Sequence, residues 1–160
     1  MITKKDEIIL SLLKENCKLC SREISEKTGI PVTTIHNRIK KMEQEGIIRQ
    51  YAALVNNKKL GKIIQAFVQI TVTYSTPAGK HVSQEELAKK IYQMPEVEEC
   101  YIMTGGADIL TKVSVKDVDE LNNFIINKLM DTEGVQNTLT SIVLSDISYS
   151  TKKHDLIINA

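Results

Sequence analysis

The sequence predicts an α+β fold, in which an N-terminal winged helix-turn-helix precedes a ferredoxin-like βαββαβ domain. Up to about residue 46, apolar residues recur at helical spacing, and beyond residue 62 they alternate with polar residues as in half-buried strands. The second part repeats a β-α-β order at intervals of about 40 residues, which is typical of a ferredoxin-like sandwich. The polar turn at 56–61 separates these regions, so we expect domains at 1–61 and 62–160.

The first two helices are predicted from their ends as well as from their apolar sides. Thr3 is the expected N-cap of the first helix, and Asn16 falls where that helix should stop. The apolar stripe of this helix consists of Ile8, Ile9, Leu12 and Leu13. The second helix, at about 21–27, has Cys20 where a Ser would cap it and Glu23 as the reciprocal partner of a capping box.

A tight turn at Thr28–Gly29 leads to the third helix, because glycine adopts positive φ without steric cost. Ile30 should enter the core, and Pro31 suits the first turn of the helix. The buried side consists of Ile35, Ile39 and Met42. The opposite side consists of Thr33, Asn37, Lys40, Lys41 and Gln44, flanked by Thr34 and His36. Gly46 ends the helix, and 47–55 is predicted to be a strand carrying a small wing.

Four strands and two helices account for the second domain. The strands are predicted at 66–74, 97–104, 108–115 and 135–148. Ser83 with Glu86, and Asp117 with Glu120, form the capping boxes that open the two helices. Both helices should cover one face of an antiparallel sheet. The other face, which includes Phe67, should be buried against a second copy of the chain.

The composition indicates a soluble folded protein with an uneven charge distribution. Hydrophobic residues make up 42% and charged residues 26% of the chain, and the net charge is +1. Residues 1–60 contain 12 Lys or Arg against 7 Asp or Glu, whereas residues 61–160 contain 9 against 13. A basic first half attracts phosphates. We expect a cytoplasmic protein, because the sequence contains neither a signal peptide nor an apolar run long enough to cross a membrane.

The cysteines and histidines do not predict a metal site. Cys17 and Cys20 have the spacing of a metal or redox pair, but no second pair completes a zinc tetrahedron. We interpret Cys20 as a helix cap, with a thiol switch as the alternative. His36, His81 and His154 lie far apart in the sequence. We therefore expect no metal and no cofactor.

Short segments along nearly the whole chain match one known family in order and spacing. In the first half these are Ile9–Leu13 with Glu15–Asn16, Glu23–Ile24, Gly29–Ile30, Arg38–Glu43, Gly46–Tyr51 and Leu60–Gly61. In the second half they are Pro95–Val97, Cys100, Thr104–Gly105, Asp108, Gly134–Val135, Thr138 and Thr140. With these segments the chain resembles the Lrp/AsnC (feast/famine) transcriptional regulators of bacteria and archaea.

The resemblance implies a homodimer with two winged helix-turn-helix heads, often assembled into tetramers or octamers. It implies that the second domain is an effector-binding RAM domain. Amino acids or related small metabolites would bind near the turn from Gly105 to Asp108, between dimers. The chain departs from the family at Cys20 and Pro31, where Ser is usual, and in the loop 75–82, which is longer than in many members.

The third helix supplies the candidate contacts to double-stranded DNA. Asn37 has the donor and acceptor needed to pair with adenine, whereas Thr33 and Thr34 suit a thymine methyl or a phosphate. His36 suits either kind of contact. The expected phosphate contacts are Arg38, Lys40 and Lys41. The alternative interpretation is a solvated helix face, which Lys-rich helices usually have.

The candidate effector site lies at the turn between the second and third strands of the second domain. Backbone amides at Gly105 and Gly106 would hold a carboxylate, while Asp108 would receive an ammonium group. The alternative is a plain hairpin turn, in which Asp108 accepts backbone hydrogen bonds. Thr104 belongs to the same turn. Thr138 and Thr140 either complete a polar pocket or merely alternate along a strand.

The predicted function is sequence-specific DNA binding by a two-fold dimer on a pseudo-palindrome, without enzymatic activity. One alternative is tetrapyrrole chemistry, because sirohaem decarboxylases resemble this family. That chemistry would need a pocket of His and Arg, and residues 61–160 contain no Arg. The other alternative is an effector-sensing interaction protein that has lost DNA binding, and the basic first half argues against it.

Overall fold

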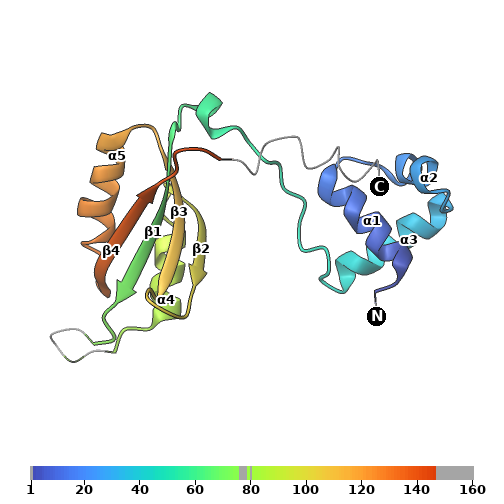
Figure 1. The fold of residues 1–160 in the computed structure, drawn as a ribbon. Helices are drawn as coiled ribbons and strands as arrows, with labels where there is room; N and C mark the ends of the chain where they lie inside the picture. The colour runs from blue at the N-terminus through green and yellow to red at the C-terminus, as the bar shows by residue number, and fades with distance from the viewer. Residues whose placement is uncertain (1, 76–78, 80, 147–160) are drawn as a thin grey trace. The chain divides into compact units, whose positions relative to one another are not determined.

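The computed structural model describes residues 2–75, 79 and 81–146, and the chain divides into two compact units (Figure 1). The units are residues 1–55 and 56–160, whereas the sequence suggested a boundary at residue 61. The difference arises from a short 3-10 helix, η1 (Asn57–Leu60). The Asn57 side-chain amide donates to Glu98 and, at 3.2 Å, to the Ser114 hydroxyl, so η1 is fastened to the sheet of the second unit.

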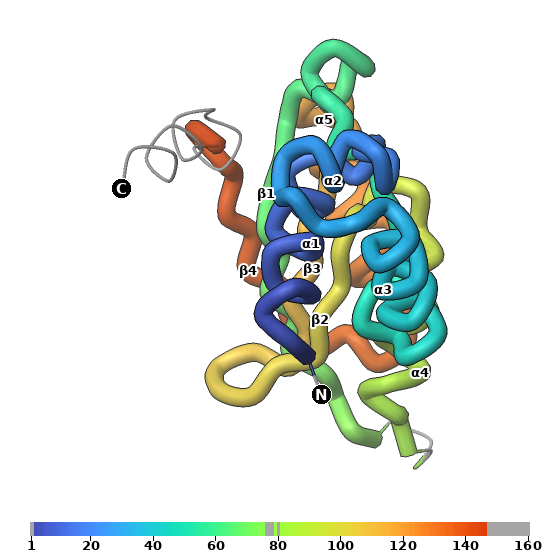
Figure 2. The backbone as a smooth tube through the Cα atoms, turned by 90° about the vertical axis from the view of Figure 1, so that its right-hand side faces the viewer, coloured from blue at the N-terminus to red at the C-terminus, as the bar shows by residue number. Residues whose placement is uncertain are grey.

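The first unit contains three helices, as predicted (Figure 2). They are α1 (Lys4–Glu15), α2 (Ser21–Thr28) and α3 (Val32–Gln44). Thr3 caps α1 through a capping box, and the Cys20 backbone N–H donates to Glu23 at 2.7 Å at the start of α2. Gly29 ends α2 with a φ of 70°, in the left-handed region that the turn requires. The core consists of Ile9, Leu13, Ile24, Ile30, Ile35 and Met42.

The predicted strand over 47–55 is wrong for the part of the chain that the structure describes. The backbone N–H groups of Ile47 and Ile48 both donate to the Met42 carbonyl, which closes the end of α3. The chain from Tyr51 to Val55 has no regular structure, and Leu54 is 82% exposed. A strand needs a hydrogen-bonded neighbour, and no described segment lies beside this one as a strand.

The second unit has the predicted βαββαβ order. Its elements are β1 (Ile64–Val72), α4 (Gln84–Tyr92), β2 (Val97–Ile102), β3 (Ile109–Val115), α5 (Val118–Asn123) and β4 (Val135–Ile142). The strands form one antiparallel sheet in the order β2-β3-β1-β4, which is the ferredoxin-like arrangement. None of the helices in the described ranges is both long and apolar enough to cross a membrane.

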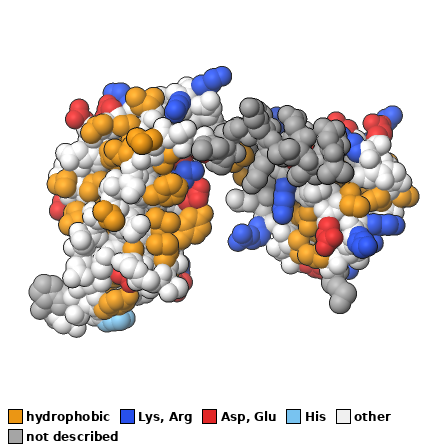
Figure 3. Space-filling view, in the orientation of Figure 1, with side chains coloured by type: hydrophobic (Ala, Val, Ile, Leu, Met, Phe, Trp, Pro, Cys, Tyr) orange, Lys and Arg blue, Asp and Glu red, His pale blue; other side chains and the backbone are white. Residues whose placement is uncertain are grey.

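One face of the sheet packs against both helices. Alternate residues of β1 and β3 point into this core, and α4 and α5 meet them with Leu87, Ile91, Leu121 and Phe124. The residues from the strands are Ala66, Val68, Ile70, Val72, Ile109, Val113 and Val115. The opposite face of the sheet, called the open face below, presents the exposed side chains Phe67, Tyr101 and Leu139. Figure 3 shows hydrophobic side chains spread over this unit.

A π-helical segment, η2 (Phe124–Leu129), continues α5 and was not predicted. The Met130 N–H donates to the Ile125 carbonyl at 2.9 Å, five residues back. Phe124 and Leu129 are themselves five residues apart, and an α-helix would turn them to different sides. The wider turn lets both side chains be fully buried in the core.

Candidate functional site

Helix α3 presents five of the seven predicted DNA contacts on its exposed side. Ile35 and Met42 are buried and Ile39 is partly buried, so the first unit holds the helix by one side. The exposed candidates are Thr33, His36, Asn37, Lys40 and Lys41, while Thr34 and Arg38 are partly buried. Residues of these types on one face can reach base edges and phosphates.

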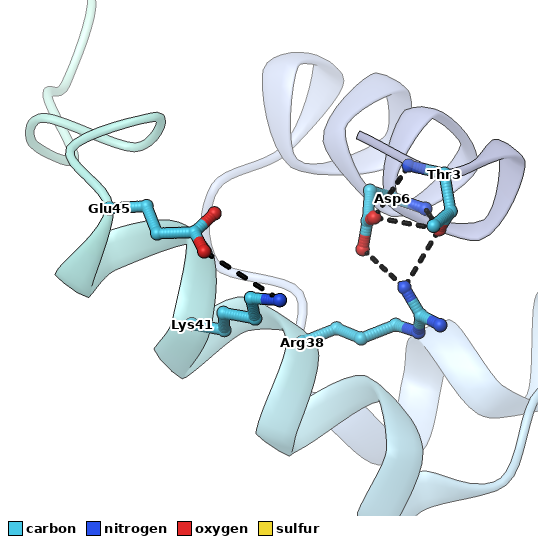
Figure 4. A network of polar contacts seen from close by, with 5 residues as sticks. All are labelled: Thr3, Asp6, Arg38, Lys41 and Glu45. Carbon is cyan, nitrogen blue, oxygen red and sulfur yellow. Dashed lines mark hydrogen bonds and ion pairs between the residues drawn. The ribbon is translucent and has the colours of Figure 1, made fainter. Parts of the chain in front are cut away.

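Lys41 already has an acidic neighbour on its own helix. Its Nζ lies 3.6 Å from the Glu45 carboxylate (Figure 4), and both side chains are well exposed. Exposed pairs of this kind contribute roughly 0–1 kcal/mol. Lys41 can therefore exchange Glu45 for a phosphate at little cost.

Arg38 differs from the other candidates because its side chain points toward the start of α1 (Figure 4). Its Nη1 donates to the Thr3 hydroxyl at 2.7 Å and to the Asp6 carboxylate at 2.8 Å. The Thr3 hydroxyl in turn donates to Asp6 at 2.7 Å. The hydrogen bond from Thr3, together with Arg38, lowers the pKa of Asp6 to about 2 against the opposing effect of burial.

Asp108 ties the predicted effector turn to the end of β1. Its carboxylate accepts hydrogen bonds from the Val72 N–H at 2.8 Å and from the Tyr74 hydroxyl at 2.7 Å. Its carbonyl accepts from the Met103 N–H and from the Gln84 side-chain amide, both at 2.8 Å. The bond to Asp108 raises the pKa of Tyr74. The chain itself therefore uses Asp108 as an acceptor at a turn, with one hydrogen bond to each carboxylate oxygen.

The structure brings part of the predicted effector set together. Thr104, Gly105 and Gly106 are exposed in the same turn as Asp108, and Gly105 has a φ of 115°. Thr138 and Thr140 lie instead on β4, opposite Ile70 and Val68 of β1. Sequence reasoning missed two residues that contact the turn, Tyr74 and Gln84. Their signals were slight: a tyrosine at the end of a predicted strand, and a glutamine after the helix-capping Ser83.

A small hollow of about 170 Å³ lies at the start of α4, apart from the predicted effector residues. It is lined by His81, Val82, Ser83, Glu86, Leu87, Lys90 and Glu133. Among the described residues, no group of three or more His, Cys, Asp or Glu side chains could hold a metal ion. His154 lies outside the described residues. Cys17 and Cys20 are exposed free thiols.

Comparison with known proteins relates each half of the chain to a family. Residues 65–152 match the Lrp/AsnC ligand binding domain, and residues 2–49 match a winged helix-turn-helix DNA-binding domain. The HTH-type transcriptional regulator FL11 of Pyrococcus furiosus is 40% identical over 139 residues, which is 87% of each chain.

Solved structures with the same fold include two transcriptional regulators. One is the regulator NMB0573 of Neisseria meningitidis in complex with L-Met, which is 31% identical with a TM-score of 0.84, covering 94% of this chain and 95% of that one. The other is AsnC of E. coli, which is 31% identical with a TM-score of 0.76, covering 91% and 94%. Neither tetrapyrrole chemistry nor loss of DNA binding finds support in these matches.

Proposed function

The chain belongs to the Lrp/AsnC family of transcriptional regulators, and we propose that it regulates transcription as a homodimer whose α3 helices read a pseudo-palindromic DNA site. One observation carries the proposal: polar and basic side chains share the exposed side of α3 while its apolar side is buried. A two-fold dimer places two such helices in successive major grooves, with half-sites about 10 bp or a multiple of that apart. We place this activity in the cytoplasm, where archaeal relatives such as the regulator FL11 of Pyrococcus furiosus would meet the chromosome.

The side chains of α3 divide into two kinds of contact. Asn37 reads a base, because an amide pairs bidentately with adenine, and Thr33, Thr34 and His36 contact neighbouring bases or phosphates. Lys40 and Lys41 neutralise phosphates, which adds affinity without sequence preference. The exposure of Asn37 and of both lysines supports this division.

The second unit is proposed to bind an amino acid or a related small metabolite and to join the protomers. The effector binds at the turn 104–108, where exposed glycines offer amides and Asp108 offers a carboxylate. Thr138 and Thr140 lie on β4, on the other side of β1 from this turn, and are not assigned to the effector surface. The N. meningitidis relative was solved with L-Met, which supports an amino-acid effector. The open face pairs two protomers, and further contacts build tetramers or octamers.

DNA sites selected from a random library, with and without a panel of amino acids, provide the test. With the selected site, Asn37→Ala should relax preference at one base position, at a cost of about 1–3 kcal/mol. Lys41→Ala should weaken binding to every sequence and reduce the slope of log affinity against log salt by about 0.9. Gln44→Ala, on the same side of α3, is the matched control for helix content.

Two results would contradict the proposal. A selected pool that shows no enriched sequence would exclude sequence-specific reading. Equal salt slopes for the parent and Lys41→Ala would remove the phosphate role of Lys41.

A further inference from the structure

Among the predicted DNA contacts, Arg38 stands out because its described partners lie at the start of a different helix, α1. Its Nη1 donates to Thr3 and Asp6, and Asp6 also accepts from the Thr3 backbone N–H at 2.8 Å (Figure 4). The three residues thus form a closed network between the first turn of α1 and the middle of α3. The partners are 35 and 32 residues away from Arg38 in the sequence.

The burial of the network distinguishes it from a surface ion pair. The Asp6 side chain is only 10% exposed and that of Arg38 30%, whereas the exposed pair Lys41–Glu45 has 67% and 45%. Arg38 precedes the buried Met42 by four residues, so both lie on the same side of α3. Removing either member of the network leaves the other charge partly buried without its partner, and breaking such a pair is costly.

We infer that Arg38 is a positioning residue, which together with Asp6 and Thr3 sets the orientation of α3 on α1 and makes no phosphate contact. The inference rests on the proposed function, because the orientation matters for reading DNA. Base contacts depend on how a helix sits in the groove, whereas attraction to phosphates depends mainly on charge. Loss of the network therefore lowers the preference for the specific site more than it lowers binding to random DNA.

Asp6→Asn separates this role from a phosphate role. The variant is nearly isosteric and removes a negative charge from a DNA-binding unit. If Arg38 bound phosphate, losing the nearby carboxylate would strengthen binding to all DNA. If Arg38 positions α3, the specific-to-random affinity ratio should fall by roughly 5- to 150-fold, the range expected for one lost base contact.

The measurement is DNA affinity against salt for the full chain with Asp6→Asn, Arg38→Gln and the double variant. Each single variant should lower the specific-to-random ratio, and the double variant should lower it no further than the single variant with the larger loss. The salt slope for the specific site should stay within about 0.3 of the parent's, well short of the 0.9 expected per lost phosphate contact. A variant that is merely less stable would lower specific and random binding together. Arg38→Lys should restore much of the ratio, because a single nitrogen makes both bonds.

The inference would be overturned if Arg38→Gln reduced the slope of log affinity against log salt by about 0.9 while Asp6→Asn strengthened DNA binding. Failure of the proposed function is distinguishable, because the parent would then select no site. In that case amide hydrogen exchange still decides. Faster exchange in α1 and α3 in both single variants supports the positioning role, and unchanged exchange overturns it.

Discussion

Replacing Phe67 with glutamine should weaken the proposed dimer, because Phe67 lies at the centre of the open face. The side chain is 38% exposed in the single chain. For an aromatic group of roughly 200 Å², about 75 Å² is left for a partner to bury. At about 25 cal/mol/Å² this is worth about 2 kcal/mol. A two-fold interface contains the residue twice, so the full loss is about 4 kcal/mol, or nearly a thousandfold in the dimer dissociation constant.

Glutamine is chosen because Gln65 and Gln69 flank Phe67 on the same face of β1 and already fit the strand. A glutamine keeps part of the contact area, so we expect the dimer dissociation constant to rise by about 10²- to 10³-fold. Sedimentation over a dilution series measures the dissociation constant, and circular dichroism checks the fold. Val118→Gln, an exposed apolar position on α5, is the control. A dissociation constant for Phe67→Gln equal to that of Val118→Gln would refute pairing through the open face.

Three further predictions concern single contacts. The pKa of Asp6 is lowered from 3.8 to about 2, so the ionised carboxylate contributes about 1–2 kcal/mol to stability after solvent screening. This contribution is complete above pH 4 and is lost as the pH falls toward 2. Urea unfolding should therefore show a difference in the free energy of unfolding between the parent and Asp6→Asn that shrinks over that interval, and a constant difference would count against the prediction. Gly134→Ala should cost roughly 2–4 kcal/mol, because φ is 102° and a Cβ would meet Val82 at 2.6 Å, whereas Gly61→Ala, strained but open, should cost about 1–2 kcal/mol in the same unfolding assay. Tyr74→Phe should weaken binding of whichever panel amino acid the parent binds by roughly tenfold, the lower end of the value of one hydrogen bond to a charged group, and calorimetry showing equal affinity would exclude a role for Tyr74.

Helices and strands with a regular apolar pattern were predictable, because a buried side repeats at the period of the element. Ile35 and Met42 mark the inner side of α3 at helical spacing, and the even-numbered residues from Ala66 to Val72 mark the inner side of β1. Helix ends were predictable for the same local reason. A cap such as Thr3 or Ser83 bonds to an N–H three residues away, so both partners are visible in one short segment.

Features that depend on distant partners were not predictable. The segment 47–55 is apolar enough for a strand, but strand formation needs a neighbour that the sequence does not identify. The π-turn of η2 follows from two core residues five apart, Phe124 and Leu129, whose burial is decided by the sheet beneath them. The hydrogen bond between Arg38 and Asp6 was not predictable either, because the two residues lie on different helices, 32 positions apart in the sequence.

The hydrogen bonds that Asp108 already accepts limit how the proposed effector could bind at this turn. An ionised carboxylate has about four acceptor positions, and the Val72 N–H and Tyr74 hydroxyl occupy one on each oxygen. An ammonium group can therefore use the remaining positions without displacing either donor. The two existing bonds hold the carboxylate in a fixed orientation, which reduces the entropy lost when a ligand binds. An effector bound at the turn would thus reinforce the link between β1 and β3 and would not need to break it.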